Sequence, residues 1–391
     1  MERNEKQGLA FIRTVTNIFP IPDADNIEVA QIGGWKVVVK KNEVKTGDKV
    51  VYFEIDTMLP LENPLFAFLE PRGFKELDGK KYHRLKTAKL RKQISQGLVI
   101  PAELLGMGII AIDTDVTEKL NLLKYEPDMG STKTKGMRTS VGNVMGKFPS
   151  HLGFDKTDET RIQNSLEYIT NWKGKEVVAT VKMDGTSSTF YLTKNPKYNV
   201  KKWFGLHHKF MKFIGKEVLP HDYGVCSRNL RVNTNKKVSV PDFGNVYNKV
   251  SDELMIKESL LDYYHKTGNH MCIQGEIMGS SIQGNPLKLK DGETKLFVFN
   301  VFNITEQKYL SHTEAVKFVE TLGLEFVPIA FEGIFNWNTL DELLEFSEGK
   351  YTSGVNREGV VFRLKNETMK DEHGKNSFKV VSNSYLLKNE K

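Results

Sequence analysis

The chain has 391 residues, of which 39% are hydrophobic and 27% charged, a composition typical of a folded globular protein with two or three domains. Its two cysteines exclude a disulfide framework and a Cys-x-x-Cys metal site. No apolar stretch is long enough to span a membrane, and the charged N-terminus leads to no signal-peptide core. We therefore expect an intracellular, cytoplasmic protein, with a nuclear or virus-encoded one left open. The formal charge of +7 favours a polyanionic partner.

Residues 9–101 read as short strands separated by turns. The runs at 35–40 and 49–55 are rich in β-branched and aromatic residues, and Pro, Gly and Asp punctuate the stretches between them. This pattern predicts a small barrel of the OB type, although a small β-sandwich would have the same pattern. We assign residues 1–124 to this all-β domain.

The strongest basic cluster of the chain lies in this domain, where nine cations stand against Glu76 and Asp78. They are Arg72, Lys75, Lys80, Lys81, Arg84, Lys86, Lys89, Arg91 and Lys92. Such a cluster is either a solvated charged loop or a surface that follows the phosphates of a nucleic acid. A second basic and aromatic stretch, residues 196–220, is either an amphipathic insert or a surface that stacks on bases.

We expect residues 125–147 to be a linker because glycines and a proline interrupt a stretch without periodicity, and residues 148–391 to form the second domain. Helices are predicted from Thr157 to about Thr170, from a Ser251 cap to Gly268, from a Ser311 capping box to Gly323, and near 340–346. Strands are predicted at 94–100, 176–181, 187–192, 271–277, 295–302, 359–364 and 378–381.

The sequence Lys182-Met183-Asp184-Gly185 is the turn on which the second domain is centred. Two β-rich runs flank it, and Asp-Gly is typical of a reversal, so Lys182 is expected at a strand end. A lysine is a poor nucleophile at its ordinary pKa of about 10.4, and burial or nearby cations lower that pKa. Taken alone, the motif is more typical of a solvated strand-end lysine than of a nucleophile.

Five further motifs follow Lys182 in a fixed order. They are Ser227-Arg228-Asn229, Gly275-Glu276-Ile277, residues 297–302, Glu358-Gly359-Val360-Val361 and Ser377-Phe378-Lys379-Val380. The series resembles motifs I, Ia, III, IIIa, IV and V of the covalent nucleotidyl-lysine enzymes, which are ATP-dependent DNA and RNA ligases and mRNA capping enzymes. The resemblance implies an α+β fold, in which an N-terminal OB-like barrel precedes a nucleotidyltransferase domain of antiparallel sheets with flanking helices.

The order of the domains narrows the resemblance. DNA ligases and capping enzymes typically carry an OB domain after motif V, where we expect only residues 380–391 here. A β-domain instead precedes motif I, and Lys156-Thr157-Asp158-Glu159-Thr160-Arg161 lies just upstream of that motif. This arrangement is similar to the Deinococcus–Naegleria type of ATP-dependent RNA ligase.

That resemblance implies a role for each site residue. Lys182 would attack the α-phosphate of ATP and carry AMP, while Asp184, Glu276 and Glu358 would hold Mg²⁺ or Mn²⁺ directly or through its waters. Lys379 would neutralise the α-phosphate in the transition state. The remaining nucleotide-binding set is Arg161 for the β- and γ-phosphates, Val181, Ser187, Arg228 for the ribose or phosphates, and Phe299 for the adenine.

Three of these roles have alternatives. Phe299 could be a core aromatic, and Arg161 a solvated helix arginine. RNA ligases often have Lys-x-Lys in motif V, whereas Ser377 precedes Lys379 here. Either Lys375 takes the place of the first lysine, or one lysine suffices.

The whole pattern predicts an ATP-dependent RNA ligase that joins 3′-OH and 5′-phosphate ends through lysyl-AMP and RNA-adenylate, at nicks in RNA-containing duplexes. We expect a monomer without a membrane partner. The alternatives are a DNA ligase or GTP-using capping enzyme, and a non-catalytic nucleic-acid-binding protein.

Overall fold

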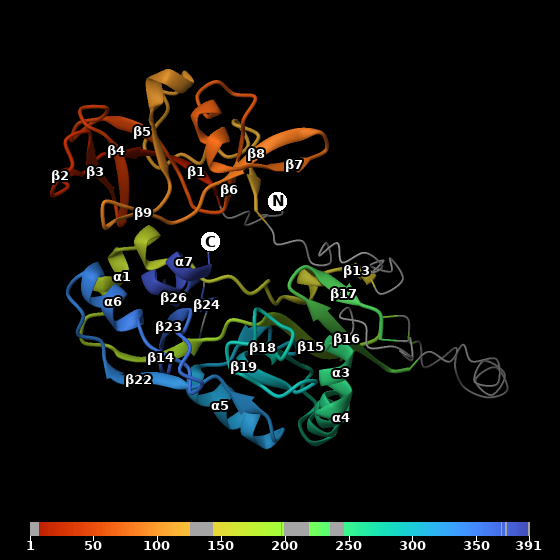
Figure 1. Cartoon of the computed structure of the whole chain (residues 1–391). Coiled ribbons are helices and arrows are strands. Elements are labelled where there is room, and N and C mark those ends of the chain that lie inside the picture. The colour runs from red at the N-terminus through yellow and green to blue at the C-terminus, as the bar shows by residue number, and fades with distance from the viewer. Residues whose placement is uncertain are drawn as a thin grey trace. The chain divides into compact units, whose positions relative to one another are not determined.

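The computed structural model describes residues 8–125, 144–196, 198, 219–234, 246–368, 370–371 and 374–389. The chain divides into two compact units, which Figure 1 colours by residue number. The first comprises Met1–Ser131, Ile162–Thr170 and Asn383–Lys391, and the second comprises Thr132–Arg161 and Asn171–Ser382. Strands outnumber helices among the described elements, and the predicted α+β class is confirmed.

The first unit consists of short antiparallel strands, as predicted. One sheet has the order β1 (Ala10–Thr14), β5 (Lys49–Phe53), β11 (Leu98–Pro101), and another has β2 (Asn17–Pro20), β3 (Ile27–Ile32), β4 (Trp35–Lys40). A third has the order β12 (Leu123–Lys124), β6 (Thr57–Pro60), β8 (Lys80–Arg84), β7 (Lys75–Leu77), and β9 (Ala88–Leu90) pairs with β10 (Gln93–Ser95). The strand predicted at 94–100 is split between β10 and β11 by Gly97, whose φ is 103°.

A segment distant in sequence completes the first unit. Its 3₁₀ helix η5 (Ile162–Asn164) places Asn164 between Trp35 and Glu54: Trp35 Nε1 donates to Asn164 Oδ1 at 2.6 Å, and Asn164 Nδ2 donates to Glu54 Oε1 at 2.8 Å. A Cβ on Gly34 would lie 2.7 Å from the backbone of Gln163, so glycine is needed for this approach. The short helices α1 (Glu167–Asn171) and α7 (Asn383–Asn389) also fall almost wholly within this unit.

The helix predicted from Thr157 is wrong. Helical structure begins only at Ile162, because Thr160 O accepts a bond from Lys379 N at 2.8 Å and Arg161 forms a parallel bridge with Lys379. Backbone groups that pair with a neighbouring strand are not available for a helix. The apolar spacing of Ile162, Leu166 and Ile169 therefore spans two short helical pieces rather than one long helix.

Two antiparallel sheets form the frame of the second unit. The larger has the order β13 (Val144–Lys147), β17 (Leu230–Val232), β16 (His221–Ser227), β15 (Thr186–Lys194), β18 (Met271–Gly279), β19 (Thr294–Asn303), β20 (Lys308–Tyr309), with β21 (Glu325–Phe326) paired to β19. The smaller has the order β22 (Ile329–Ile334), β14 (Glu176–Lys182), β23 (Gly359–Leu364), β26 (Ser377–Val381). Each predicted strand of this domain is confirmed to within three residues at either end.

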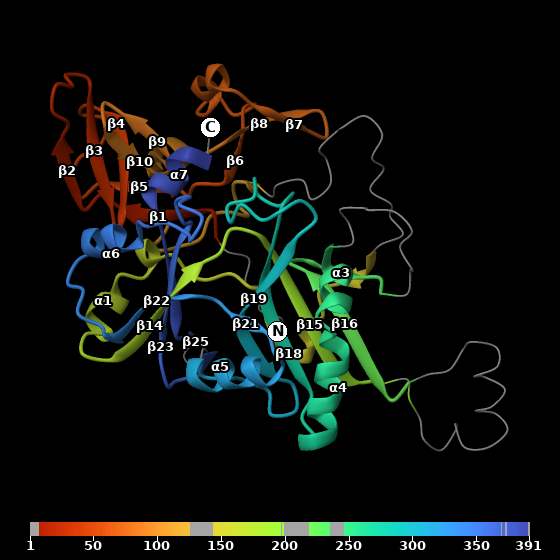
Figure 2. The ribbon, with the colours of Figure 1, turned by 60° about the horizontal axis from the view of Figure 1, so that its bottom comes forward.

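Helices cover one face of the larger sheet (Figure 2). Side chains from α3 (Val246–Glu253), α4 (Ile256–Thr267) and α5 (His312–Thr321) form one core with alternate residues of β15, β16, β18 and β19. The Ser311 capping box of α5 is confirmed, and so are α6 (Leu340–Ser347) and the end of α4 at Gly268. The Ser251 cap is wrong because Ser251 lies inside α3, and the chain breaks at Met255, whose φ is 47°.

Strand register brings the motifs of the second unit together. In the smaller sheet Lys182 lies opposite Gly359, and Gly359 lies opposite Val381. In the larger sheet Ser187 lies opposite Glu276. The turn 183–185 connects the two sheets, so residues from both lie near Lys182.

Candidate active site

Lys182 ends β14, as predicted, and the turn after it requires glycine. A Cβ on Gly185 would lie 2.3 Å from Ile277 O and 2.7 Å from Met278 Sδ, so any larger residue would push the turn off β18. Gly185 N donates to Glu276 Oε1 at 3.1 Å, which ties the turn to the neighbouring carboxylate. The Lys-x-Asp-Gly pattern therefore has a steric reason as well as a chemical one.

Three carboxylates act on the Lys182 ammonium, and Glu358 is its direct partner. Lys182 Nζ lies 2.7 Å from Glu358 Oε2, and both side chains are less than a third exposed. Burial lowers the pKa of Lys182, but Glu358, Glu276 and Asp184 outweigh burial, so this pKa is raised. Without a cation on the carboxylates, the lysine is held as a charged ammonium rather than as a nucleophile.

The ionised form of Glu276 is disfavoured in this arrangement. Burial raises its pKa to about 8, Glu358 and Asp184 add to the rise, and Lys182 opposes it. Among the described residues no three His, Cys, Asp or Glu side chains lie close enough to coordinate one metal ion by themselves. The arrangement of Asp184, Glu276 and Glu358 therefore fits a cation that is held through its waters and through a bound phosphate.

Tyr351 connects Lys182 to Glu358 through hydrogen bonds, and no sequence motif indicated this residue. Its hydroxyl donates to Lys182 O at 2.8 Å and accepts from Glu358 N at 3.1 Å. The ring is 6% exposed and packs in a cluster with Met183 and Phe297. One hydroxyl thus connects the backbone of two motifs that are 176 residues apart. Nothing in the local sequence around Tyr351 indicates this contact, because it depends on packing between segments distant in sequence.

Phe299 lies at a β-bulge, and Val181 packs near it. The pairing of β18 with β19 shifts between Gln274 and Gly275, so that Phe299 falls at the irregularity. Bulges re-aim side chains and are common beside active sites. Phe299 is half-buried, and it packs with Val181 against the cluster that contains Met183 and Tyr351. This position is compatible with its predicted contact to a base.

Two of the predicted phosphate-binding cations meet at one carboxylate. Lys379 Nζ lies 2.6 Å from Asp158 Oδ1, and Arg228 Nη2 lies 2.9 Å from Asp158 Oδ2. Burial lowers the pKa of Lys379, Arg161 and Lys182 lower it further, and Asp158 opposes them. The structure thus brings Arg228 and Lys379 together at Asp158, with Arg161 paired to Lys379 in the backbone and Lys182 close enough to act on its charge.

A buried arginine, Arg363, forms hydrogen bonds to residues of both sheets beside this group. Arg363 is 3% exposed and donates to Thr180 Oγ1 and to Asn300 Oδ1, each at 3.2 Å. Glu159 lies 3.7 Å from it and accepts a bond from Ser377 Oγ. Ser377, which replaces the first lysine of the expected Lys-x-Lys pair, is therefore engaged in holding the 155–161 segment. The side chain of Lys375 lies outside the described residues.

The basic cluster predicted in the first unit lies on exposed hairpins. Eight of its nine side chains are exposed, and the half-buried Arg84 pairs with Asp56 and lies 3.8 Å from the Tyr125 ring centroid. Most of the 125–147 linker and most of the basic stretch at 196–220 lie outside the described residues. No helix in the described part of the chain is long and apolar enough to cross a membrane.

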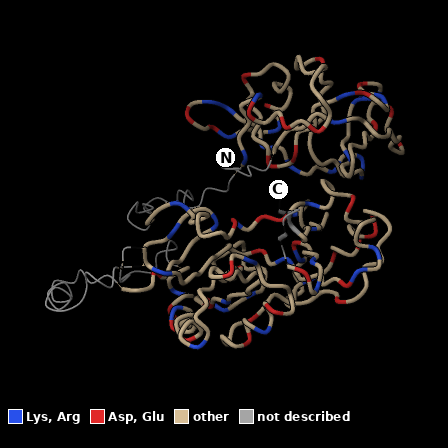
Figure 3. The backbone as a smooth tube through the Cα atoms, turned by 180° about the vertical axis from the view of Figure 1, so that it is seen from behind, with Lys and Arg blue, Asp and Glu red and all other residues tan. Residues whose placement is uncertain are grey.

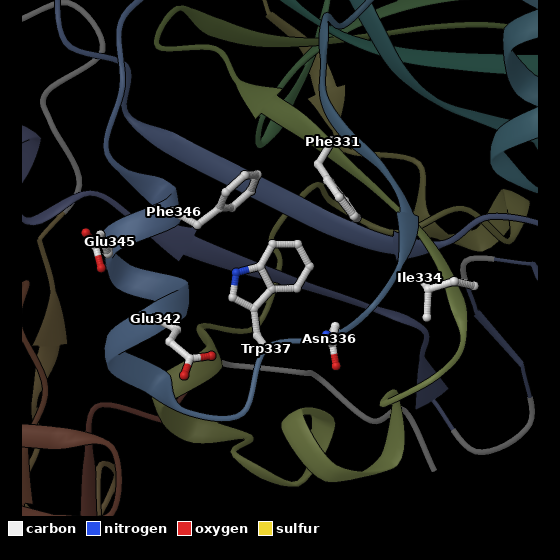
Figure 4. Close-up of a pocket in the computed structure, with 7 residues that line it drawn as sticks. All are labelled: Phe331, Ile334, Asn336, Trp337, Glu342, Glu345 and Phe346. Carbon is white, nitrogen blue, oxygen red and sulfur yellow. The ribbon is translucent and has the colours of Figure 1, made fainter.

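A pocket of about 520 Å³ lies away from these residues (Figure 4). Trp337 lies between Phe331 and Phe346, with Glu342 and Glu345 at the rim. Two of its lining residues lie on β22, where Ile334 pairs with Glu176 and Phe331 with Ala179, about 20 and 10 Å along β14 from Lys182. None of the lining residues is a predicted site residue, so we do not assign the pocket to the nucleotide.

Comparisons with known proteins agree with this geometry. An RNA ligase family matches residues 175–381, and an OB-fold domain family matches residues 9–102. A lysine-to-alanine variant of the Naegleria gruberi RNA ligase with ATP and Mn is 31% identical and covers 97% of this chain and 98% of its own, with a TM-score of 0.77.

Two further structures of the Naegleria enzyme match equally well. A lysine-to-methionine variant with AMP and Mn has a TM-score of 0.77, and the enzyme with PPi has one of 0.76; both are 31% identical and cover 97% of this chain and 98% of their own. No curated protein sequence matches the chain significantly. The N-terminal OB fold is confirmed, and with Lys182 among its carboxylates and the family matching residues 175–381, the chain belongs to the RNA ligase family.

Proposed function

We propose that this RNA ligase uses ATP to join 3′-OH and 5′-phosphate ends, and that its substrate is a nick in an RNA-containing duplex. The observation that carries the proposal is the Lys182 ammonium, held at a strand end by Glu358 and surrounded by Glu276 and Asp184. Arg228 and Lys379 converge on one carboxylate, and Arg161 pairs with Lys379 in the backbone. A nucleophilic amine, a carboxylate set and three cations are the groups that nucleotidyl transfer needs.

In the first step Lys182 Nζ attacks the α-phosphorus of ATP. A P–N bond forms, the bond from the α-phosphorus to the bridging oxygen breaks, and pyrophosphate leaves. The lysine must lose a proton for this attack, and Glu358 Oε2, 2.7 Å away, is placed to accept it. Lys379 and Arg228 neutralise charge on the phosphate, and Phe299 offers a half-buried ring to the adenine.

The later steps use the same residues. An oxygen of the RNA 5′-phosphate attacks the phosphorus of lysyl-AMP, so that a P–O–P bond forms, the P–N bond breaks and the lysine amine is regenerated. The 3′-OH then attacks the adenylated 5′-phosphate, a phosphodiester bond forms, and AMP leaves. Ser187, beside Glu276 in the sheet, lies near the site for this sealing stage.

Asp184, Glu276 and Glu358 would hold Mg²⁺ or Mn²⁺, mainly through its waters. Such an ion supplies positive charge that offsets the carboxylates around Lys182 and the developing charge on the α-phosphate. The fit is supported by Glu276, whose raised pKa marks a carboxylate in need of a cation. Solved variants of the Naegleria enzyme with ATP or AMP contain Mn. Its lysine and aspartate variants also lie two positions apart, as Lys182 and Asp184 do.

The first unit would grip the nucleic acid. Its exposed cations on the β7–β8 and β9–β10 hairpins lie outside all of the nucleotidyltransferase motifs. Solvated lysines and arginines bind phosphates through counterion release, without contributing to the chemistry. The domain limits 1–124, 125–147 and 148–391 remain a prediction. We also assign the enzyme as a monomer in a reducing, intracellular compartment, in keeping with its buried free cysteines, Cys226 and Cys272.

Transfer of label from ATP tests the first step. The protein is incubated with [α-³²P]ATP and Mg²⁺ or Mn²⁺ and run on a denaturing gel. Lys182→Ala and Lys182→Arg should both lose the label, because arginine stays protonated. Lys194→Ala, which alters an exposed lysine at the far end of β15, should label normally. Undiminished labelling of either Lys182 variant would refute the assignment.

Sealing assays test the substrate. Nicked RNA, DNA and hybrid duplexes are compared with single strands of the same sequence at equal concentration. We expect sealing to be fastest at nicks with RNA at the 3′-OH end. Equal or faster joining of single strands would refute the nick proposal while leaving the ligase assignment intact.

A further inference from the structure

The 155–161 segment contains no helix and is anchored on both sheets. Thr157 Oγ1 lies 2.6 Å from Ser187 Oγ on β15 of the larger sheet. On the smaller sheet, Glu159 contacts Ser377 and Arg363, and Thr160 O accepts from Lys379 N at 2.8 Å. The backbone on each side of Asp158 is therefore held, while the Asp158 side chain is 30% exposed.

The two oxygens of Asp158 are divided between two cations. Oδ1 lies 2.6 Å from Lys379 Nζ and Oδ2 lies 2.9 Å from Arg228 Nη2. Lys379 is 12% exposed, so its charge has little solvent around it. Two cations that converge on one anion in this way present the same geometry and charge to a phosphate as they do to a carboxylate.

Under the proposed function these two cations serve the nucleotide's phosphate. A phosphate and the Asp158 carboxylate cannot both bind there, because like charges at that separation repel and the two compete for the same donors. We propose that Asp158 is an internal substitute for the α-phosphate, which occupies the Lys379–Arg228 pair in the free enzyme and is displaced when the nucleotide binds. This inference rests on the proposed function and deepens it.

The substitute has a physical reason. Arg161 and Lys182 act on Lys379 as like charges. An anion beside Lys379 offsets this repulsion in the empty site, and the tethered Asp158 carboxylate supplies it without a ligand. The same carboxylate competes with AMP as well as ATP, so its return favours release of AMP after sealing. Asp158 therefore stabilises the nucleotide-free enzyme and at the same time weakens nucleotide binding.

Asp158→Asn tests the competition, because it removes the charge at constant size. Binding of AMP and of adenosine is measured by titration calorimetry on the full chain. We expect AMP to bind about tenfold more tightly to the variant, the effect of removing one partly buried charge competitor. Adenosine has no phosphate, so its affinity should not change. In the absence of ligand the variant should melt at a lower temperature than the wild type.

Two controls keep the result interpretable. Asp262→Asn makes the same charge change on the exposed face of α4, where Asp262 pairs with Lys266 at 3.1 Å. It should leave the affinity for AMP unchanged. Asp158→Glu keeps a carboxylate and should bind AMP no more than a few-fold differently from the wild type. If Asp158→Asn binds AMP no more tightly, or more weakly, the carboxylate does not compete with the phosphate and the inference is overturned.

A parallel labelling assay separates this inference from the function on which it rests. If the wild type takes no label from ATP, the proposed function fails. If the wild type is labelled and Asp158→Asn shows no gain in AMP affinity, only the role of Asp158 fails.

Discussion

The two units use charge in different ways. In the second, the Lys182–Glu358 and Lys379–Asp158 pairs lie among side chains that are 12–30% exposed. Glu358 helps to raise the pKa of Lys182, whereas burial lowers the pKa of Lys379 against the effect of Asp158. In the first unit, the Lys80–Glu62 and Lys81–Glu70 pairs of the basic cluster lie among side chains that are 48–62% exposed, and only Arg84–Asp56 within that cluster is half-buried. Figure 3 marks the acidic and basic residues along the chain.

This difference in exposure separates charged residues suited to catalysis from those suited to binding. A partly desolvated pair interacts more strongly and is screened much less by salt, so removal of one partner leaves an uncompensated charge. An exposed pair contributes about 0–1 kcal/mol and is screened within about 10 Å at 0.1 M salt. We therefore expect substitutions in the second unit to change rate constants and those in the first to change the salt dependence of binding.

The largest effect is expected from the carboxylates. Glu358→Gln and Glu276→Gln should each slow lysyl-AMP formation by roughly 100-fold or more, the scale of losing one electrostatic group at a reacting phosphate. Single-turnover labelling with saturating ATP measures this rate. Wild-type rates in both variants across Mg²⁺ concentrations would contradict the comparison.

Glu276 also gives a prediction in pH. Because its pKa is raised to about 8 in the folded chain, this carboxyl contributes a destabilisation that grows as pH rises above its unfolded value of about 4.5 and is complete above pH 8. Glu276→Gln cannot ionise. At pH 8–9 in chelator it should therefore melt at a higher temperature than the wild type, while the two melt alike near pH 4. Equal melting temperatures at both pH values would show that the buried charge is otherwise compensated.

Tyr351→Phe should have the next largest effect. It removes both hydrogen bonds to Lys182 O and Glu358 N but keeps the buried ring, so the fold should survive. Two hydrogen bonds at about 1 kcal/mol each predict a fall in the labelling rate of about 10- to 30-fold. The KM for ATP should stay unchanged, because the hydroxyl contacts protein and not nucleotide. A change in KM alone would assign Tyr351 to nucleotide binding instead.

A smaller effect is expected from the exposed cations of the first unit. Lys89, Arg91 and Lys92 are chosen because their side chains are exposed, whereas Arg84 pairs with Asp56. The triple alanine variant should form lysyl-AMP normally but bind nicked duplex more weakly, with a log–log salt slope reduced by about one unit per lost contact. Lys266→Ala on exposed α4 is the control. An unchanged slope would place the nucleic acid elsewhere.

The smallest effect on activity is expected at Asn164. Asn164→Ala removes the bonds to Trp35 and to the buried Glu54, so the melting temperature should fall by a few degrees. The labelling rate should change by less than about twofold, because both bonds lie within the first unit. A large loss of labelling would show that the first unit influences lysyl-AMP formation, which would contradict the division of roles between the two units.

Local sequence patterns were enough to predict most of the secondary structure and the chemical groups proposed for the site. Alternation of β-branched residues located the strands around Lys182, and capping chemistry located α5 and the end of α4, because these signals depend on neighbours within a few residues. The order of Lys182, Glu276, Glu358 and Lys379 indicated the reaction class. The same local reasoning failed at Thr157, where pairing with β26 prevents a helix, and at Ser251, where Met255 breaks it.

Which of these groups meet depends on strand register and packing. Three carboxylates were candidates for Lys182, and strand register selects Glu358 by setting Gly359 opposite the lysine. Packing also brings Tyr351 to Lys182 and Asp158 to both phosphate-binding cations. These contacts join residues 70 to 221 positions apart, and a local sequence pattern reports burial but not the distant partner.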